Sequence, residues 1–264
     1  MRKLSNFFKD IAIIVLTYNS QDKIHNTLRP ITKFEEIIVI DNGSDDNTLS
    51  IISEYTKNIY VFKEKNMRLV RNYALSKTKK NWVLFIDSDE IISPHNLMRL
   101  AEKFYEKNSS FDGFWLARRN YFENKNNSYL KYGLFYPDYQ LRLFKSKYSY
   151  KFSPHEEPDI NKMNTFHLPN VEIYHYPDKS KYFSILGIFK FYNFIHNYSK
   201  DLVKYSYSYL LFVGFWKFID LFFISLTRGK GFLDGYLGIV AAFNFASQIS
   251  LIHFYAIYRK IKTK

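Results

Sequence analysis

Four short apolar runs in the first third of the chain constrain its fold more than any other feature. None of them alternates apolar with polar side chains, and they cover residues 11–16, 37–40, 59–62 and 82–86. Such runs are typical of strands covered on both faces, as in a parallel sheet wrapped by helices. The intervening segments have helical length, at residues 22–33, 45–55, 67–77 and 94–106. The sequence therefore predicts an α/β fold with a mainly parallel sheet flanked by helices.

The second half of the sequence is less regular. Two further strands are expected at residues 113–117 and 139–144. Polar, proline-marked segments predict loops at residues 120–137 and 153–170. Long loops beside a rigid sheet commonly recognise a substrate.

Polar and acidic residues directly follow three of the apolar runs. The first run leads into residues 17–19, the second into residues 41–46 and the fourth into residues 87–90. Ligands of open α/β sheets collect at the carboxyl ends of the strands. We therefore expect a binding site at this edge of the sheet.

Asp87 and Asp89 form an Asp-X-Asp pattern at the end of an apolar strand. One carboxylate would contact a ribose or a metal ion, and the other would bind a divalent cation that bridges phosphates. Two acids one residue apart are a weak pattern, and an exposed turn is the alternative. The preceding strand favours the functional interpretation.

The residues after the first two runs would line a nucleoside pocket. Tyr18 would pack against a base, Asp41 would accept a hydrogen bond from a ring N–H, and Thr17 and Asn19 would complete the wall. Alternatively, Asn19 caps the next helix and Asp41 begins a tight turn. Arg71 would reach a phosphate or simply face solvent.

No glycine-rich phosphate loop follows the first run, which argues against dehydrogenases and P-loop NTPases. A diphosphate would then depend on a metal ion and on arginine. Gln140 and Arg142 alternate with leucines, so both would lie on one face of a strand where the guanidinium can grip a diphosphate.

The segment His155-Glu156-Glu157, between two prolines, supplies a candidate general base. A group transfer that inverts configuration needs one carboxylate to take the proton of the attacking acceptor hydroxyl. Glu156 is our first candidate for this base and Glu157 the second. An ordinary solvated acidic loop is the alternative. His155 and His175 are candidate metal or phosphate ligands, although most isolated histidines are neither.

The last third of the sequence is aromatic and basic. Residues 179–264 contain twelve lysines and arginines against three aspartates, so +9 of the net charge of +13 lies there. This asymmetry attracts anionic lipid, a phosphorylated glycan or nucleic acid. Because the basic residues stand among aromatic and apolar ones, we expect an anionic membrane surface as the partner and no nucleic acid.

The segment at residues 237–258 is long enough to cross a membrane. Residues 209–226 contain Lys217 and Asp220, and residues 237–258 contain an expected polar stripe. The stripe consists of Asn244, Ser247 and Gln248. We therefore expect helices that lie in the membrane interface, with basic residues 259–264 contacting headgroups; a true span and buried packing helices are the alternatives.

The chain has no cysteine and no visible secretion signal. Disulfides and thiolate metal sites are therefore excluded, in agreement with a reducing compartment. We expect a peripheral or monotopic protein at the cytoplasmic face of the inner or plasma membrane.

Several of these motifs, in this order, resemble the family 2 glycosyltransferases of GT-A fold. The resemblance rests on Leu16–Asn19, Ile40–Ser44, Arg71-Asn72 and Phe85–Glu90. It implies an inverting enzyme that uses a nucleotide-sugar donor and usually Mg²⁺ or Mn²⁺. Asp41 and Asp89 would serve the nucleotide and the metal.

Further motifs resemble the subgroup that contains bacterial lipopolysaccharide-core β-glucosyltransferases. They are Arg118–Asn120, Tyr136–Phe144, His155-Glu156 and Gly231–Gly235. The resemblance implies transfer from a donor such as a UDP-hexose to a cell-envelope glycan or glycolipid, with Gln140 and Arg142 near the diphosphate. His155-Glu156 stands where many members place the base, often as Glu-Asp.

We therefore expect a glycosyltransferase domain over residues 1–177 and a membrane-interface region over residues 178–264. Within the domain, the nucleotide-sugar half would cover about residues 8–110 and the acceptor half residues 111–177. The rival hypotheses are a transferase for capsule, teichoic-type or protein glycans, and a non-catalytic basic protein that binds membranes or nucleic acid.

Overall fold

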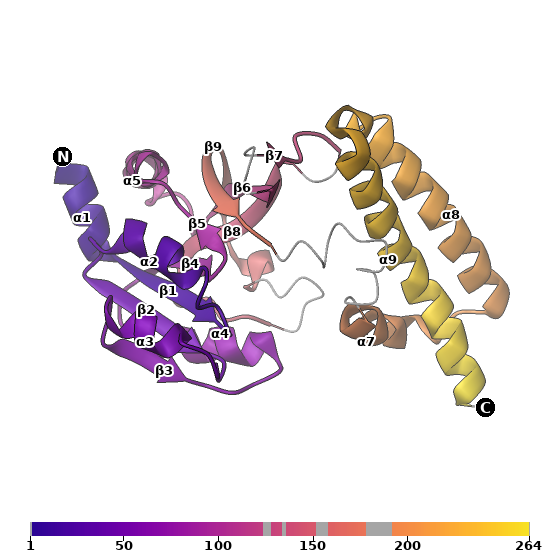
Figure 1. Ribbon diagram of the computed structural model, residues 1–264, viewed down its shortest axis with the longest axis horizontal. Helices are drawn as coiled ribbons and strands as arrows, with labels where there is room; N and C mark the ends of the chain where they lie inside the picture. Colours follow the sequence, from indigo (N-terminus) through magenta and orange to yellow (C-terminus); the bar gives the residue numbers. More distant parts are fainter. Residues whose placement is uncertain (1, 124–127, 134–135, 152–157, 178–191, 264) are drawn as a thin grey trace. The chain divides into compact units, whose positions relative to one another are not determined.

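The protein forms two compact units, which we call the sheet unit and the helical unit. The sheet unit contains Met1–Arg119 and Tyr139–His175, and the helical unit contains Asn120–Asp138 and Tyr176–Lys264. The computed structural model describes residues 2–123, 128–133, 136–151, 158–177 and 192–263 (Figure 1). The chain thus enters the helical unit at residue 120, returns to the sheet at 139 and leaves it again after 175.

The strands form a mixed sheet in the order β3-β2-β1-β4-β8-β6-β9-β5, with β7 beside β6. Their bounds are β1 Ile11–Thr17, β2 Glu36–Asp41, β3 Asn58–Val61, β4 Trp82–Asp87, β5 Glu90–Ile91, β6 Gly113–Glu123, β7 Ser128–Tyr129, β8 Asp138–Lys145 and β9 Thr165–His175. The contiguous block β3-β2-β1-β4 is parallel, whereas β8 runs antiparallel to β4. The predicted parallel sheet is therefore confirmed for the four apolar runs.

Helices cover both faces of this parallel block. In β1, Ile11 and Ile13 face one apolar cluster, while Ala12 and Ile14 face the other. Because side chains alternate between faces along a strand, an uninterrupted apolar run is required when both faces are buried. The sheet unit's helices are α1 Arg2–Asp10, α2 Ile24–Leu28, α3 Thr48–Ser53, α4 Met67–Leu75 and α5 Pro94–Lys107, with short 3₁₀ turns η1 Arg29–Ile31 and η2 Ile160–Lys162.

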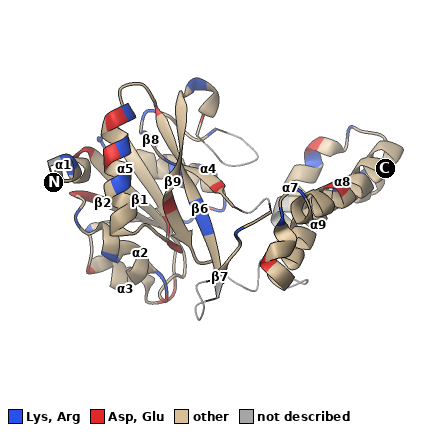
Figure 2. Cartoon of the chain, turned by 90° about the horizontal axis from the view of Figure 1, so that it is seen from above, with Lys and Arg blue, Asp and Glu red and all other residues tan. Residues whose placement is uncertain are grey.

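Local sequence explains where α5 begins. The Ser93 side chain accepts a hydrogen bond from the backbone N–H of Asn96, and Pro94 occupies the first turn, where no N–H is needed. Figure 2 shows acidic and basic residues at several positions along α5. The other side buries Leu97, Leu100 and Phe104 in the core.

Two predicted loops contain strands. Residues 153–170 were expected to be a loop, but β9 begins at Thr165 and passes through Pro169. Its registered pairs with β5 involve only Tyr174 and His175, so this pairing does not extend to Pro169. Likewise, β6 continues to Glu123 and pairs with β7 inside the expected loop 120–137.

The helical unit is built around two long antiparallel helices. Its described helices are α7 Tyr192–Leu202, α8 Tyr207–Leu226, the 3₁₀ turn η4 Gly231–Asp234 and α9 Gly235–Lys262. Gly214 of α8 lies against α9, where an added Cβ would meet the His253 Cβ at 3.1 Å. Its carbonyl accepts a hydrogen bond from the Ser250 hydroxyl at 2.8 Å. Glycine therefore allows the two helices to approach closely.

The expected polar stripe of α9 faces the interior of the helical unit. Asn244 and Ser247 are buried among the helices, so the stripe does not mark a headgroup-facing side. Helical periodicity shows which residues share a face but not what covers that face. By length and composition, Tyr207–Leu226 and Gly231–Lys262 are both candidates for crossing a membrane.

A carboxylate at the α8–α9 corner holds a segment from the middle of the chain. Asp234 accepts hydrogen bonds from the backbone N–H groups of Lys131, at 3.1 Å, and Tyr132, at 3.0 Å. Beside them, the Gly133 N–H donates to the Gly229 carbonyl. The corner therefore orders residues 131–133.

Replacing Asp234 with alanine should free the backbone amides of Lys131 and Tyr132, because this carboxylate accepts the hydrogen bonds that both amides donate. We expect their hydrogen exchange to accelerate by about 10-fold, the equivalent of one charge-assisted hydrogen bond. Asp234→Asn keeps an acceptor oxygen and should exchange more slowly than Asp234→Ala. The matched control is Asp220→Ala on exposed α8; equal acceleration in that variant would contradict the assignment.

Candidate active site at the strand ends

The polar segments that follow the apolar runs meet at one edge of the sheet, as predicted. Thr17 at the end of β1 pairs in register with Asp41 at the end of β2. On the other side of β1, Leu16 pairs with Asp87 at the end of β4. The Thr17 hydroxyl is buried and has no hydrogen-bond partner among the described residues. Parallel pairing therefore brings three loops to one place.

The loops after β1 and β2 are joined by hydrogen bonds. Asn19, in the left-handed region with φ of 43°, accepts from the Asp45 N–H through its side chain at 3.0 Å. Its own N–H donates to the Ser44 hydroxyl at 2.8 Å. Asn19 therefore does not cap α2, whose N-cap position is Lys23. Tyr18, between these anchored positions, exposes 57% of its surface and is available to contact a ligand.

Asp41 is fully buried and organises its own turn. Its Oδ1 accepts from the N–H groups of Gly43, at 2.9 Å, and Ser44, at 2.8 Å. Gly43 has a φ of 90°, a conformation that side chains disfavour. The tight-turn alternative is thus present, and it fixes the Asp41 carboxylate beside the end of β1.

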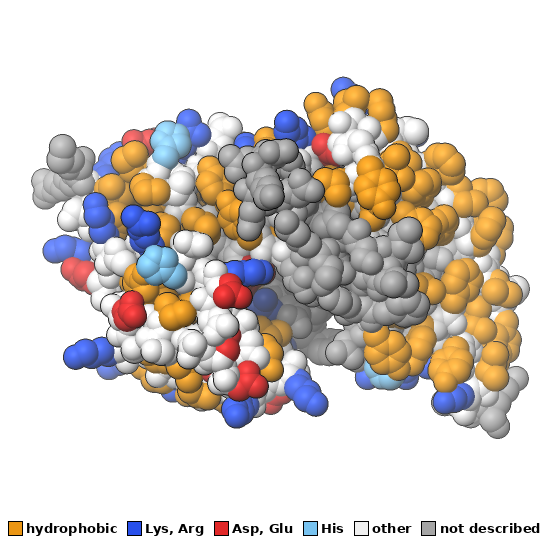
Figure 3. All heavy atoms as spheres, viewed as in Figure 1, with side chains coloured by type: hydrophobic (Ala, Val, Ile, Leu, Met, Phe, Trp, Pro, Cys, Tyr) orange, Lys and Arg blue, Asp and Glu red, His pale blue; other side chains and the backbone are white. Residues whose placement is uncertain are grey.

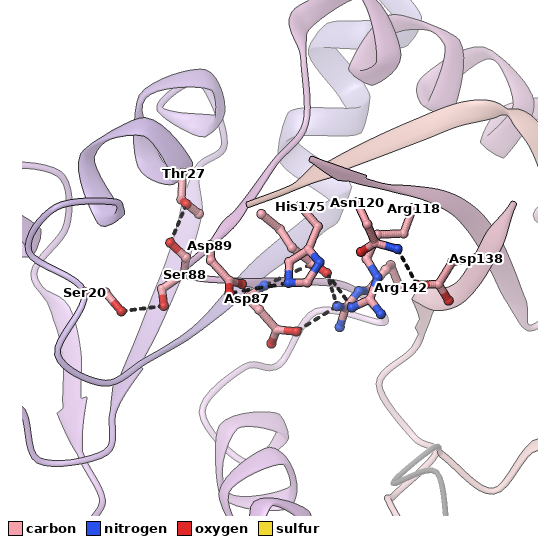
Figure 4. A network of polar contacts seen from close by, with 11 residues as sticks. Ser20, Thr27, Asp87, Ser88, Asp89, Arg118, Asn120, Asp138, Arg142 and His175 are labelled. Carbon is pink, nitrogen blue, oxygen red and sulfur yellow. Dashed lines mark hydrogen bonds and ion pairs between the residues drawn. The ribbon is translucent and has the colours of Figure 1, made fainter. Parts of the chain in front are cut away.

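A buried arginine of β8 holds the loop after β4 (Figure 4). The Arg142 Nη2 donates to Asp87 Oδ2 at 2.7 Å and to the fully buried Glu90 Oε1. Arg118 of β6 contacts the same Glu90 oxygen at 3.3 Å. Burial opposes ionisation of Asp87, but the charges of Arg142, Arg71 and Arg118 outweigh it and hold the pKa of Asp87 below its usual value. Asp87 is therefore an anion in this site.

Asp89 pairs with a histidine from β9. His175 Nε2 lies 3.4 Å from Asp89 Oδ2, and the two backbones are brought together because Glu90 pairs with His175 in the sheet. Burial opposes ionisation of Asp89 as well, but the hydrogen bond and charge of His175 keep its pKa below the usual value. Figure 4 shows Asp89 directed toward His175 and Asp87 directed toward Arg142.

Ser88, between the two aspartates, fixes the loop from its other side. Its hydroxyl is 2.7 Å from the Ser20 hydroxyl, and its carbonyl accepts from the Thr27 hydroxyl at 2.9 Å. The loop after β4 is therefore bonded to the loop after β1 and to α2. Because the backbone between Asp87 and Asp89 is held, the spacing of the two carboxylates is set before any ligand binds.

The Arg71-Asn72 pair of α4 reaches toward the same region. The Arg71 guanidinium lies over the Tyr150 ring at 5.4 Å and contributes to the field at Asp87. Asn72 donates to the Tyr150 carbonyl at 2.9 Å and accepts from its N–H at 2.7 Å. Tyr150 in turn pairs with Pro158, so both ends of the intervening segment are fixed.

That intervening segment contains His155, Glu156 and Glu157, which lie outside the described residues. Gln140 is half-buried on β8, two residues before Arg142. The structure therefore brings together Asp87, Asp89, Arg142 and His175, and it sets Asp41 in the adjacent turn.

Sequence reasoning gave no role to Glu90 or Arg118. Both were quoted within longer motifs, but an acid after Asp89 and an arginine in a strand have no pattern of their own. A fully buried Glu90 becomes visible as a structural counter-ion only when β8 and β6 are placed beside β4. Among the described residues, no cluster of three or more acidic, histidine or cysteine side chains is arranged to hold a metal by itself.

The sequence is similar to those of known glycosyltransferases. The family model described as Glycosyl transferase family 2 matches residues 12–169. TarP of Staphylococcus aureus (strain N315), a poly(ribitol-phosphate) beta-N-acetylglucosaminyltransferase, is 32% identical over 114 residues, 38% of this chain and 35% of that protein. The putative teichuronic acid biosynthesis glycosyltransferase TuaG of Bacillus subtilis (strain 168) is 25% identical over 118 residues, 41% of this chain and 47% of that protein.

The crystal structure of S. aureus TarS 1-349 in complex with UDP-GlcNAc is similar over 96% of this chain and 88% of that chain, with 17% identity and a TM-score of 0.49. The matched segments of TarP and TuaG cover less than half of each relative's own length.

Replacing Arg142 with methionine should destabilise the protein at neutral pH by about 3–5 kcal/mol, because it leaves buried carboxylates without their cation. The depressed pKa of Asp87 means that its contribution is present above about pH 4 and is lost as the pH falls below it. The difference between wild type and Arg142→Met should therefore shrink on acidification. Urea unfolding at neutral and acidic pH measures both effects.

The matched control is Arg99→Met, since Arg99 is exposed and donates to the Asn170 carbonyl at 3.2 Å. We expect a change of about 1 kcal/mol or less there. A loss of similar size in both variants, or one independent of pH, would contradict the role given to the Arg142 ion pairs.

Proposed function

We propose that the chain, which belongs to glycosyl transferase family 2, is an inverting enzyme. It would transfer a sugar from a nucleotide-sugar donor to a cell-envelope glycan or glycolipid. The observation that carries the proposal is the rigid, anionic Asp87–Asp89 loop at the strand ends. This loop lies beside the Asp41 turn and the exposed Tyr18, and Arg142 fixes it through the bond to Asp87.

The nucleoside would bind where the loops after β1 and β2 meet. Tyr18 offers an exposed ring to a base, and Thr17 has a buried hydroxyl without a partner in the described part of the chain. Asp41 and Asn19 shape this wall through the bonds that hold their turns. Asp87 would then accept from a ribose hydroxyl.

The donor set at the loop fits a divalent cation. Asp89 Oδ2 and His175 Nε2, which lie 3.4 Å apart, offer an oxygen and a nitrogen ligand. Arg142 bonds to Asp87 through Oδ2, and Oδ1 of the same carboxylate is the oxygen offered to a cation. Mg²⁺ and Mn²⁺ commonly take one or two protein carboxylates and complete their shell with substrate phosphates. The cation, Mg²⁺ or Mn²⁺, would neutralise charge that develops on the leaving diphosphate.

Two arginines would assist the diphosphate. The Arg142 Nε is buried and has no hydrogen-bond partner among the described residues, so it retains a donor beyond those used for Asp87 and Glu90. Arg71 lies near enough to act on Asp87 electrostatically. Together with Gln140, these groups would orient the leaving group without a glycine-rich loop.

A carboxylate of the segment between Tyr150 and Pro158 would be the general base. We propose Glu156 first and Glu157 second, with His155 beside them. The base takes the proton of the acceptor hydroxyl as that oxygen bonds to the anomeric carbon, while the bond from that carbon to the diphosphate breaks. Asn72 supports the proposal because it anchors Tyr150, the residue from which the segment departs.

The acceptor class is proposed from charge and from relatives. By their names, TarP acts on poly(ribitol-phosphate) and TuaG in teichuronic acid biosynthesis, and the phosphate and acid groups in these names are anionic. A net charge of +13 suits an anionic acceptor. These observations favour a teichoic-type or related anionic glycan over lipopolysaccharide core. We place the enzyme at the cytoplasmic face of the membrane, where such polymers would meet nucleotide sugars.

The function is tested by donor binding and turnover. A UDP-sugar with Mn²⁺ at about 100 times its Kd should raise Tm by roughly 5–10 °C, and the shift should require the cation. Asp89→Ala should abolish this shift and lower metal-dependent donor hydrolysis by about 100-fold or more. Glu102→Ala, on exposed α5, is the control. Near-normal activity of Asp89→Ala would sink the proposed site.

The general base has its own test. Glu156→Gln should leave the donor-induced Tm shift intact and reduce transfer by about 10²–10⁴-fold, because glutamine cannot accept the proton. Glu157→Gln, measured beside it, should retain most activity. The assignment moves to Glu157 if the two results are reversed, and an equal loss of binding and turnover would make Glu156 a binding residue.

A further inference from the structure

The outward side of α8 carries a continuous aromatic stripe. Phe212, Phe215, Trp216 and Phe223 expose 66, 56, 50 and 55% of their surfaces. Their spacing of three, four and seven residues places them on one side of a helix. We call these four residues the α8 stripe; Figure 3 shows apolar side chains gathered along this helix.

The opposite side of α8 already has its partner. Leu210, Gly214 and Ser225 are buried, and Ser250 of α9 bonds to the Gly214 carbonyl. The packing of the helical unit therefore accounts for one side of α8 only. Exposed aromatic patches of this kind mark surfaces that contact a membrane or another protein.

Charge distinguishes between these partners. Residues 207–263 contain six lysines and arginines against two aspartates, which favours an anionic surface. At the end where α8 begins and α9 finishes, Lys260 lies over the Tyr207 ring at 5.2 Å and Lys262 over Tyr258 at 5.1 Å. Tyrosine and lysine side chains each combine an apolar part with a polar end. Such side chains are favoured at the level of the lipid headgroups, between hydrocarbon and water.

The charges of α8 also decide between a span and a surface contact. Lys217 and Asp220 are exposed in the middle of the helix, where a span would place them in hydrocarbon at high cost. On the helical wheel both lie outside the arc that the α8 stripe occupies. In a helix that lies in the interface plane they would reach headgroups and water, while the stripe enters the lipid.

We propose that the α8 stripe docks in the plane of an anionic membrane interface, with the basic end of α9 on the headgroups. The α8 stripe is then the surface through which the helical unit contacts the membrane. That the acceptor lies at this membrane rests on the proposed function. The partner is a lipid surface and not a second copy of the chain.

The first experiment is cosedimentation of the full chain with vesicles of phosphatidylcholine, alone or mixed with phosphatidylglycerol. We expect binding to the anionic vesicles, reduced by salt, and about 10-fold or more weaker binding for the double variant Phe212→Ser with Trp216→Ser. The matched control is Met98→Ser, an exposed apolar residue on α5 of the sheet unit. Unchanged vesicle binding in the double variant overturns the proposal.

Tryptophan fluorescence gives an independent readout. Trp216 is exposed on the stripe, whereas Trp82 is buried in the core. Anionic vesicles should shift the emission to shorter wavelength, and Trp216→Phe should lose the shift while still cosedimenting. Lipids brominated near the headgroup should quench Trp216 more than lipids brominated at the chain ends; strongest quenching at the bilayer centre would indicate a span and overturn the in-plane contact.

Two further outcomes separate this proposal from its rivals and from the proposed function. A concentration-dependent dimer that the double variant abolishes, without vesicle binding by wild type, would assign the stripe to a second copy. The donor-induced Tm shift should be the same in the double variant and in wild type. If vesicles bind but no nucleotide sugar does, the docking surface stands and the proposed function fails.

Discussion

The ion pairs of Arg142 with Asp87 and Glu90 are the interactions on which the rest of the site depends. The pair with Asp87 joins β4, the last strand of the parallel block, to the antiparallel β8, and the pair with Glu90 joins β8 to β5. A buried arrangement of this kind is a poor source of stability when compared with apolar packing. Its value here is geometric, because it sets one carboxylate in place and leaves the neighbouring Asp89 to pair with β9.

The same arrangement explains how acids can remain charged in a buried loop. Desolvation raises the pKa of both Asp87 and Asp89, and each is countered by a specific neighbour, Arg142 for the first and His175 for the second. A cation that binds here would meet negative charge that the fold has already stabilised. The fold therefore bears the electrostatic cost of ionisation before the ligand arrives.

Sequence patterns predicted the parts of this protein that repeat a simple physical rule. The uninterrupted apolar runs predicted β1, β2 and β4, because burial on both faces leaves no other pattern. The run at residues 59–62 predicted β3, but this strand lies at the edge of the sheet and is partly exposed, so it is not covered on both faces as expected. The convergence of Thr17, Asp41 and Asp87 followed from parallel pairing. In contrast, the start of β9 was missed because Pro169 indicates a break, and the sequence does not show that β9 pairs with β5 only beyond the proline, at Tyr174 and His175. The stripe of Asn244 and Ser247 was found, but the side that it faces depends on α7 and α8, which periodicity does not position. Glu90 and Arg118 were overlooked because a counter-ion is defined by its partner.

The double passage of the chain between the two units limits how the protein can be divided. Because Asn120–Asp138 is inserted between β6 and β8, no single cut separates the sheet unit from the helical unit. A chain that ends at His175 would keep the inserted segment but lose Asp234 and Gly229, which hold the backbone of residues 131–133. The sheet would then carry a loop without its support. If the C-terminal helices were exchanged between relatives, residues 120–138 would have to be exchanged together with residues 176–264, because both segments belong to the helical unit.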